Sequence, residues 1–187
     1  MTIQEYKALL KERLSEKRYY HSLCVADSAK MLANKYGADQ EKAYFAGLVH
    51  DIMKDASEKE QLQTISDFGI ILDNVEKNAK KLWHAIAGYV YLQTVCGVTD
   101  VEILDAVRYH TTARKNMTKL DKVLYLADFI SADRTYDGID DMRSSAEIDL
   151  DFAIKNGLIF TITDLVNNNK AVHKDTFEAF NQLVNEN

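Results

Sequence analysis

Apolar residues recur every three or four positions along nearly the whole chain, a spacing that gives an α-helix one buried face. In the clearest example, Val25, Ala29, Leu32 and Tyr36 fall on a single stripe. We therefore predict an all-α fold, a single-domain helical bundle. The predicted helices cover about residues 3–14, 18–36, 40–50, 59–68, 84–95, 100–109, 119–131, 145–167 and 175–184.

Residues that favour helix ends stand where this pattern starts and stops. Gly37 follows the second helix, as a C-terminal glycine does, and Asp39, Asp100 and Thr118 occupy N-cap positions. Seven glycines and no proline leave the helices few internal breakers. The longest segments without the pattern are 69–82, 111–118 and 133–143, and functional loops are often drawn from such segments.

No repeat, low-complexity tract or Gly/Ser-rich linker divides the chain, so we predict one domain over residues 1–187. The two cysteines, Cys24 and Cys96, lack metal or redox spacing and are expected to be reduced core thiols of a cytoplasmic protein. The N-terminus lacks a signal-peptide pattern, and no apolar stretch reaches the ~18 residues of a membrane helix. We therefore expect no membrane partner.

The charge balance narrows the function further. Lys and Arg number 23 against 29 Asp and Glu, a formal net charge of −6, which argues against binding nucleic acid through overall charge. A local basic pocket stays compatible with this balance. Neither the Rossmann nor the P-loop glycine fingerprint occurs, so the common nucleotide-binding α/β folds are excluded.

Histidines and aspartates on apolar helix faces carry the candidate chemistry. His21 shares the helix face of Val25, and His50 and Asp51 close a helix whose inner face is apolar. Asp128 lies in an apolar segment, where an ionised carboxylate is costly unless a cation or several donors compensate it. A bound metal is the simplest compensation, and neutral imidazoles are its usual co-ligands.

Each of these residues also has a structural interpretation. A single core histidine is more often hydrogen-bonded than a ligand, a His-Asp dipeptide arises by chance, and Asp128 alone fits a salt bridge between helices. His173, between Val172 and Lys174, is expected to be a surface or capping residue. The combined order His, His-Asp, His, His, Asp favours a metal site over chance.

That order is the signature of the HD-domain metal-dependent phosphohydrolases, and the chain resembles this superfamily over most of its length. It is more similar to the YqeK-type branch, the bacterial symmetrical diadenosine tetraphosphate hydrolases. The segments that carry the resemblance are 18–22 (RYYHS), 47–54 (GLVHDIMK), 83–88 (WHAIAG), 107–112 (VRYHTT), 120–122 (LDK), 127–130 (ADFI), 133–134 (DR) and 138–143 (GIDDMR). Where the branch usually has Glu-Pro, this chain has Ser131-Ala132, so we expect a different local turn beside an intact set of ligands.

The resemblance implies an HD-type fold and a metal held by four residues: His21, His50, Asp51 and Asp128. In the branch the metal is similar to an iron site. The residues themselves do not choose the element, because imidazole and carboxylate suit iron, manganese, zinc or nickel. They also do not decide the number of metal ions. His84 and His110 either complete a second metal position or donate to substrate phosphate.

A polyphosphate substrate requires local positive charge from this acidic protein. Lys54, Arg134 and Arg18 lie within about two helical turns of the expected ligands and are candidates to bind phosphate oxygens. The alternatives are a solvated surface lysine for Lys54 and a loop salt bridge from Arg134 to Asp137 or Asp140.

The activity implied by the resemblance is hydrolysis of diadenosine tetraphosphate at an inner phosphate, which gives two ADP. A metal-activated water would attack phosphorus while basic side chains stabilise the charge on the non-bridging oxygens. The candidate catalytic residues are Asp51, Lys54, His84, His110 and Arg134. The candidate substrate contacts are Arg18, His21, Lys54, His84, His110, Thr111, Asp128 and Arg134. Thr111 offers a hydroxyl and an N–H to phosphate, or else caps its own loop.

Three other hypotheses stay open, the weakest being a purely structural helical bundle with chance histidines. Another HD-type enzyme, acting on nucleoside monophosphates or dNTPs, would use the same ligands. A non-catalytic helical domain that binds nucleotide or metal is the alternative from a different class, and the complete ligand set argues against it. The partners expected are a dinucleoside polyphosphate, its ADP product and, since homodimers are common among similar proteins, a second copy of the chain.

Overall fold

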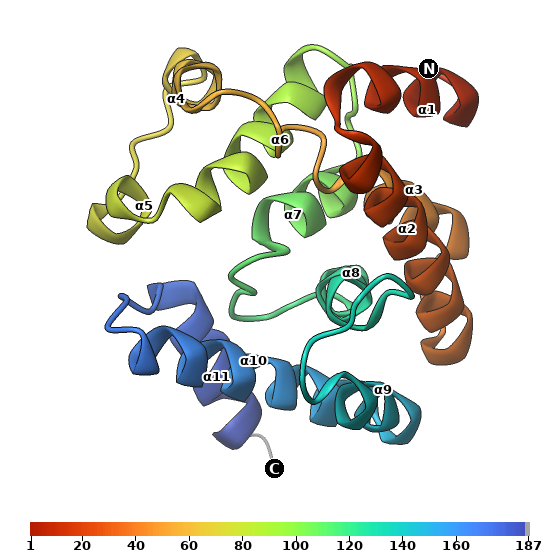
Figure 1. The fold of residues 1–187 in the computed structure, drawn as a ribbon, viewed down its shortest axis with the longest axis vertical. Coiled ribbons are helices and arrows are strands. Elements are labelled where there is room, and N and C mark those ends of the chain that lie inside the picture. The colour runs from red at the N-terminus through yellow and green to blue at the C-terminus, as the bar shows by residue number, and fades with distance from the viewer. Residues whose placement is uncertain (186–187) are drawn as a thin grey trace.

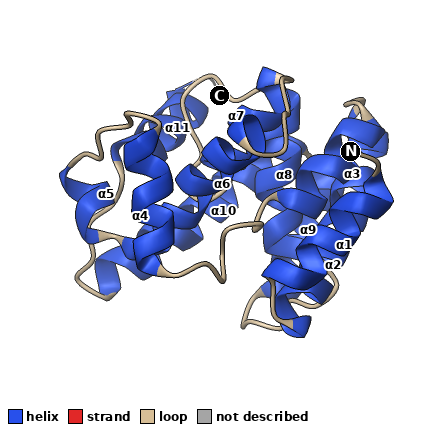
Figure 2. Cartoon of the chain, turned by 90° about the horizontal axis from the view of Figure 1, so that it is seen from above, coloured by secondary structure: helices blue, strands red, loops and turns tan. Residues whose placement is uncertain are grey.

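A computed structural model describes residues 1–185, and every regular element in that range is a helix (Figures 1 and 2). The helices are α1 (Ile3–Arg13), α2 (Glu16–Tyr36), α3 (Gln40–Val49), α4 (Glu58–Asp67), α5 (Asn74–Asn78), the 3-10 helix η1 (Lys80–Leu82), α6 (Trp83–Thr94), α7 (Val101–Tyr109), α8 (Lys119–Ile130), α9 (Ile139–Ile148), α10 (Leu150–Asn167) and α11 (Lys174–Asn185). The predicted all-α fold is confirmed. None of these helices combines the length and apolar character needed to cross a membrane.

Helix α8 lies at the centre of the arrangement (Figure 1). It packs against α2, α3, α7, α9 and α10. Its residues Val123, Leu124, Leu126 and Ala127 are fully buried, because α8 is apolar on most sides and is covered by neighbours all round. Asp128 follows directly on this buried run, so the fold carries its carboxylate into the protein.

Helices α2 and α3 approach each other closely at one glycine. A Cβ atom at Gly47 would lie 2.8 Å from the Cα atom of Ala26 and 2.9 Å from the carbonyl oxygen of Val25. Backbone atoms cannot move aside as a flexible side chain can, so only glycine permits this contact. The contact brings the rings of His21 on α2 and His50 at the end of α3 to a centroid separation of 5.3 Å.

The predicted helix ends agree with the structure at four positions. Gly37 adopts the left-handed conformation with φ of 70° at the end of α2. The side chains of Asp39, Asp100 and Thr118 accept hydrogen bonds from backbone amides in the first turns of α3, α7 and α8. These local signals set where the site-bearing helices begin.

Three predicted segments differ from the structure, and one of them, the segment 133–143 predicted to be irregular, contains the first half of α9 (Ile139–Ile148). The predicted single helix 145–167 is wrong, because the chain breaks at Asp149, which is extended (φ −158°, ψ 145°) and accepts a hydrogen bond from the Phe152 amide as the N-cap of α10. The segment 69–82, predicted to be irregular, contains α5 and η1. A reciprocal capping box between Asp73 and Glu76 stabilises α5.

Candidate metal and substrate site

Five helices deliver the predicted histidines and aspartates to one buried place. His21 comes from α2, His50 and Asp51 follow α3, His84 opens α6, His110 follows α7 and Asp128 lies near the end of α8. The five residues other than Asp128 are at most 4% exposed. Ligand atoms lie within 4.8 Å of one another in three overlapping groups: His21, His50 and Asp51; His50, His110 and Asp128; and Asp51, His84 and His110. The structure thus brings together all six residues and offers more than one metal position.

Backbone carbonyls fix which ring nitrogen of two histidines faces the centre. His50 Nδ1 lies 2.7 Å from the carbonyl oxygen of Gly47, and His110 Nδ1 lies 2.7 Å from that of Val107. A carbonyl oxygen only accepts hydrogen bonds, so both Nδ1 atoms are the protonated donors. In the form that binds a metal, the lone pair of each ring is therefore on Nε2, directed at the centre, the arrangement usual for metal-ligating histidines.

Two buried atoms at the centre lack hydrogen-bond partners among the described residues, namely His50 Nε2 and Asp51 Oδ1. His84 Nε2 lies 3.1 Å from that oxygen but without hydrogen-bonding geometry. Buried polar atoms are rarely left unsatisfied, and a lone pair beside a carboxylate oxygen is satisfied by a cation. These residues fit a divalent metal.

Burial sets the protonation of the two deepest imidazoles. It lowers the pKa of His50 to about 4 and that of His84 to about 4, so both rings are neutral at pH 7. For Asp51, burial favours the neutral acid, but the surrounding imidazoles of His50, His110 and His84 and the Lys54 ammonium hold its pKa well below the usual value. Neutral imidazoles beside an ionised carboxylate are the forms that bind a metal.

His21 is held between two carboxylates. Its Nε2 lies 3.0 Å from Asp128 Oδ1 and its Nδ1 lies 2.8 Å from Asp133 Oδ2. Burial opposes the protonated ring, yet the hydrogen bond and charge of Asp128 outweigh it and raise the pKa of His21. The sequence did not single out Asp133 as a site residue, and the Asp-Arg string at 133–134 was the only signal. The hydroxyl of Ser131 donates to Asp133 Oδ1 at 2.8 Å.

The three predicted basic residues also reach this centre. Lys54 Nζ lies 3.1 Å from His84 Nε2 and 3.8 Å from Asp51 Oδ1, and burial lowers its pKa, so the alternative of a solvated surface lysine is wrong. Arg18 Nη1 lies 3.3 Å from Asp51 Oδ2. Together with Arg134 they form a cationic rim over the ligands.

Arg134 binds Asp128 and not one of the aspartates of its own loop. Its guanidinium contacts the Asp128 carboxylate, and its Nε donates to the Asp128 carbonyl at 2.7 Å. Asp140 instead pairs with Arg143 at 3.5 Å, so no loop salt bridge engages Arg134 in residues 1–185. Because 21% of the Asp128 side chain is exposed, this edge of the centre is open to a ligand.

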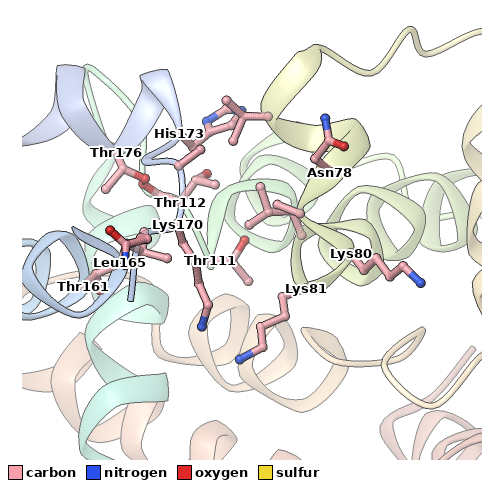
Figure 3. A pocket seen from close by; sticks show the side chains of 15 residues that line it. Asn78, Lys80, Lys81, Thr111, Thr112, Thr161, Leu165, Lys170, His173 and Thr176 are labelled. Carbon is pink, nitrogen blue, oxygen red and sulfur yellow. The ribbon is translucent and has the colours of Figure 1, made fainter. Parts of the chain in front are cut away.

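A cavity of about 500 Å³ is lined by Thr111, the residue that follows His110 of the centre along the chain, and by none of the six centre residues (Figure 3). It lies between α5 and η1 on one side and the end of α10 and the start of α11 on the other. Thr111 lines it beside Thr112. Thr111, predicted as a substrate contact, thus lies between His110 and the wall of this cavity along the chain.

His173 lines the same cavity, and its position differs from the predicted one. It is 5% exposed, so the expected surface position is wrong. The start of α11 packs over α5, which places His173 Nε2 3.5 Å from Asp73 Oδ2 and 3.7 Å from Glu76 Oε1. The expected capping role is confirmed, because the Asp175 amide donates to His173 Nδ1 at 3.2 Å.

The fold and the site define an all-helical protein with a buried histidine and aspartate centre suited to a divalent metal. The sequence matches the model of the HD domain family over residues 18–133, and the chain belongs to this family. The resemblance predicted from the motifs is confirmed.

Curated relatives and a solved structure extend this result to the full length. The symmetrical bis(5'-nucleosyl)-tetraphosphatase of Bacillus subtilis is 39% identical over 184 residues, covering 98% of both chains. The protein of the same name from Halalkalibacterium halodurans is 37% identical, covering 94% of each. A structure from Clostridium acetobutylicum, described as a predicted HD superfamily hydrolase involved in NAD metabolism, is 35% identical with a TM-score of 0.97 and covers 100% of this chain and 99% of that one.

Proposed function

We propose that this protein is a metal-dependent hydrolase that cleaves diadenosine tetraphosphate symmetrically to two ADP. The observation that carries the proposal is a buried centre with unpaired ligand atoms, next along the chain to Thr111 in the wall of a cavity of about 500 Å³, a volume typical of small-molecule sites. Relatives named symmetrical bis(5'-nucleosyl)-tetraphosphatase, similar over nearly the whole chain, support the substrate and the position of cleavage.

Four residues would hold the metal in this proposal: His21, His50, Asp51 and Asp128. Iron is the element we propose, and His84 with His110 would complete a second position if two ions bind. When bound, a divalent cation supplies an activated water at neutral pH and neutralises charge on phosphate.

The protein's own cations would hold the polyphosphate at this centre. Lys54 and Arg18 stand beside Asp51, and Arg134 presents a planar guanidinium beside the exposed edge of Asp128. Both kinds of side chain pair well with phosphate oxygens, and arginine binds two of them at once. Charge that develops on the non-bridging oxygens is stabilised by groups already fixed in place, which lowers the barrier without further reorganisation.

His84 and His110 have a separate role in this proposal. Their Nε2 atoms lie 3.2 Å apart, and His84 Nε2 also faces Lys54 at 3.1 Å. If one ion binds, His84 is free to donate a hydrogen bond to a phosphate oxygen, and His110 would do so from Nε2 in its protonated form. Asp51, which we propose as a metal ligand, also orients the attacking water through its carboxylate. Thr111 offers its hydroxyl to the phosphate chain from the wall of the cavity.

Product analysis tests the proposal directly. Protein purified without oxygen and loaded with Fe(II) is incubated with diadenosine tetraphosphate, and the products are separated by chromatography. ADP as the single product is the expected result. AMP with ATP would indicate asymmetric cleavage, turnover of dNTPs or nucleoside monophosphates alone would indicate another HD-type reaction, and nucleotide binding without turnover would indicate a binding domain.

We also propose that the protein forms a homodimer and acts in the cytoplasm. One face of α10 exposes Phe152, Ile159, Phe160 and Val166 at 39%, 45%, 43% and 58%, an apolar stripe that a second copy would cover. A nucleotide substrate and the unpaired thiols Cys24 and Cys96 support an intracellular place. Light scattering in solution tests the dimer, and a monomer at all concentrations would contradict it.

A further inference from the structure

The cavity beside the metal site has an unusual charge for this protein. Fifteen residues line it, and they include Lys80, Lys81, Lys170 and His173 but no aspartate or glutamate. The whole chain carries 29 acidic residues against 23 lysines and arginines. A lining with cations alone, in an acidic protein, indicates an anionic ligand.

The three lysines of this cavity differ in their partners. Lys80 Nζ lies 2.8 Å from both carboxylate oxygens of Glu58, so its charge is already paired. No carboxylate of residues 1–185 pairs with the ammonium group of Lys81 or Lys170. Figure 3 shows these two side chains directed toward the same space beside the cavity, whereas Lys80 points away from it.

Two ammonium groups that face the same space repel each other, and no acidic lining residue relieves that repulsion. An anion between Lys81 and Lys170 would turn the repulsion into two attractive contacts. Lysine presents a compact charge that suits a phosphate oxygen.

We propose that Lys81 and Lys170 form a phosphate clamp that holds the phosphate next to the nucleoside in the cavity and so determines the preference for nucleotides over nucleosides. The clamp rests on the proposed function, because it assumes a nucleotide whose base-bearing end occupies this cavity. Thr111 lines the cavity and follows His110 of the metal centre, so the phosphate chain of such a nucleotide runs from the cavity toward that centre. Lys81 and Lys170 act on substrate binding, and the cleavage step is left to the metal centre.

The test compares four variants of the full-length, metal-loaded protein: Lys81→Ala, Lys170→Ala, the double variant, and Lys80→Ala as the matched control. Calorimetry measures the Kd of ADP and of adenosine, and steady-state kinetics measures KM and kcat for diadenosine tetraphosphate. We expect the double variant to weaken ADP binding and raise KM by about tenfold, while adenosine binding and kcat change less than about twofold. Lys80→Ala should behave as wild type in all four measurements.

The failure of the clamp is distinguishable from that of the proposed function. The clamp is overturned if the double variant keeps the wild-type Kd for ADP, if Lys80→Ala weakens ADP binding equally, or if the wild-type protein does not bind ADP. If wild-type protein binds ADP with the expected dependence on both lysines but does not cleave diadenosine tetraphosphate, the clamp stands and the proposed reaction is wrong. All three lysines are exposed, so circular dichroism should show folded variants with unchanged thermal midpoints.

Discussion

At the scale of single residues, the same kind of hydrogen bond to the backbone orients two histidines of the centre. His50 and His110 each follow the last residue of a helix, and each donates from Nδ1 to the carbonyl oxygen three residues earlier. The bond satisfies a carbonyl at a helix end, which lacks an intrahelical partner there, and it directs Nε2 inward. Position at the end of a helix therefore explains both the orientation and the tautomer of these rings.

The carboxylate of Asp133 binds Nδ1 of His21 and so orients this ring, as the backbone carbonyls orient His50 and His110. We predict that Asp133→Asn weakens metal affinity by about 10- to 100-fold, because the amide holds the ring less firmly and makes Nε2 less basic. The measurement is a metal titration of the chelator-treated protein, followed by calorimetry. Asp137→Asn is the control, since Asp137 is exposed four residues further along. Equal affinities for Asp133→Asn and wild type would contradict this role.

At the scale of helices, the close contact of α2 with α3 positions His21 against His50. We predict that Gly47→Ala destabilises the protein by about 1–3 kcal/mol, because the new methyl group meets backbone atoms at 2.8 and 2.9 Å that cannot adopt another rotamer. The same variant should bind metal more weakly, since α3 must move away from α2. Urea unfolding and metal titration measure the two effects.

Gly88→Ala on α6 is the matched control for that substitution. A Cβ atom there meets Val107 Cγ1 at 3.6 Å and the His50 carbonyl at 3.8 Å, which are ordinary van der Waals contacts. Alanine also has a better helix propensity than glycine by up to about 1 kcal/mol, so this variant should be as stable as wild type or more stable. If Gly47→Ala were equally well tolerated, the close approach would not constrain the helices.

The first turn of α7 carries a pH-dependent contribution to stability. Lys42 hydrogen-bonds Asp100 and lowers the pKa of its carboxyl, and the Glu102 amide adds to the effect. A carboxyl whose pKa is lowered on folding stabilises the protein above its unfolded value of about 3.9, and this contribution is lost as pH falls through the folded value. Asp100→Asn keeps an N-cap acceptor but removes the charge. We predict that it is less stable than wild type at pH 7 and that the difference closes below about pH 4.

Asp100→Ala separates the cap from the charge. Without an N-cap acceptor it should lose about 1 kcal/mol relative to Asp100→Asn at every pH. Urea unfolding of chelator-treated protein at pH 7 and pH 3 measures both differences. A gap between wild type and Asp100→Asn that stays constant across this range would show that the ion pair with Lys42 contributes nothing.

Helix starts and stops were predictable where a capping residue stood beside a long periodic run, as at Asp39, Asp100 and Gly37. The break at Asp149 was not, because an aspartate inside an apolar periodic run has the same spacing as one on the exposed face of a continuous helix. Helix α5 was missed because five residues are too short for a periodic signal, although the Asp73 and Glu76 capping box was present in the sequence.

In the candidate site, too, some features could be predicted from the sequence and others could not. The spacing of histidines and aspartates predicted which side chains meet, because each lies on or just after the inner face of a long helix. Lys81 and Lys170 gave no such signal: they are far apart in the sequence, and only the packing of η1 near the end of α10 places them at one cavity. Whether a lysine already has a carboxylate partner, as Lys80 has, is decided by that packing alone.

At the scale of the whole molecule, the centre joins five helices. The ligand atoms come from α2, the end of α3, α6, the end of α7 and α8, so a bound metal would link both halves of the chain. A ligand that binds only the folded protein stabilises it, by about 2.7 kcal/mol at a free concentration of 100 times Kd. We therefore predict that chelator lowers the thermal midpoint of protein as purified and that added Fe(II) or Mn(II) restores it.

Asp51→Asn makes this prediction specific to the centre. The amide keeps the size of the side chain but removes the charge from an oxygen that lies in two of the three ligand groups. The variant should retain its fold, lose metal in elemental analysis, and show a thermal midpoint that neither chelator nor metal moves. Asp137→Asn, with an exposed carboxylate, should respond to both as wild type does. If metal shifted the midpoint of Asp51→Asn as much as that of wild type, the stabilising ion would bind elsewhere in the protein and the assignment of Asp51 as a ligand would be wrong.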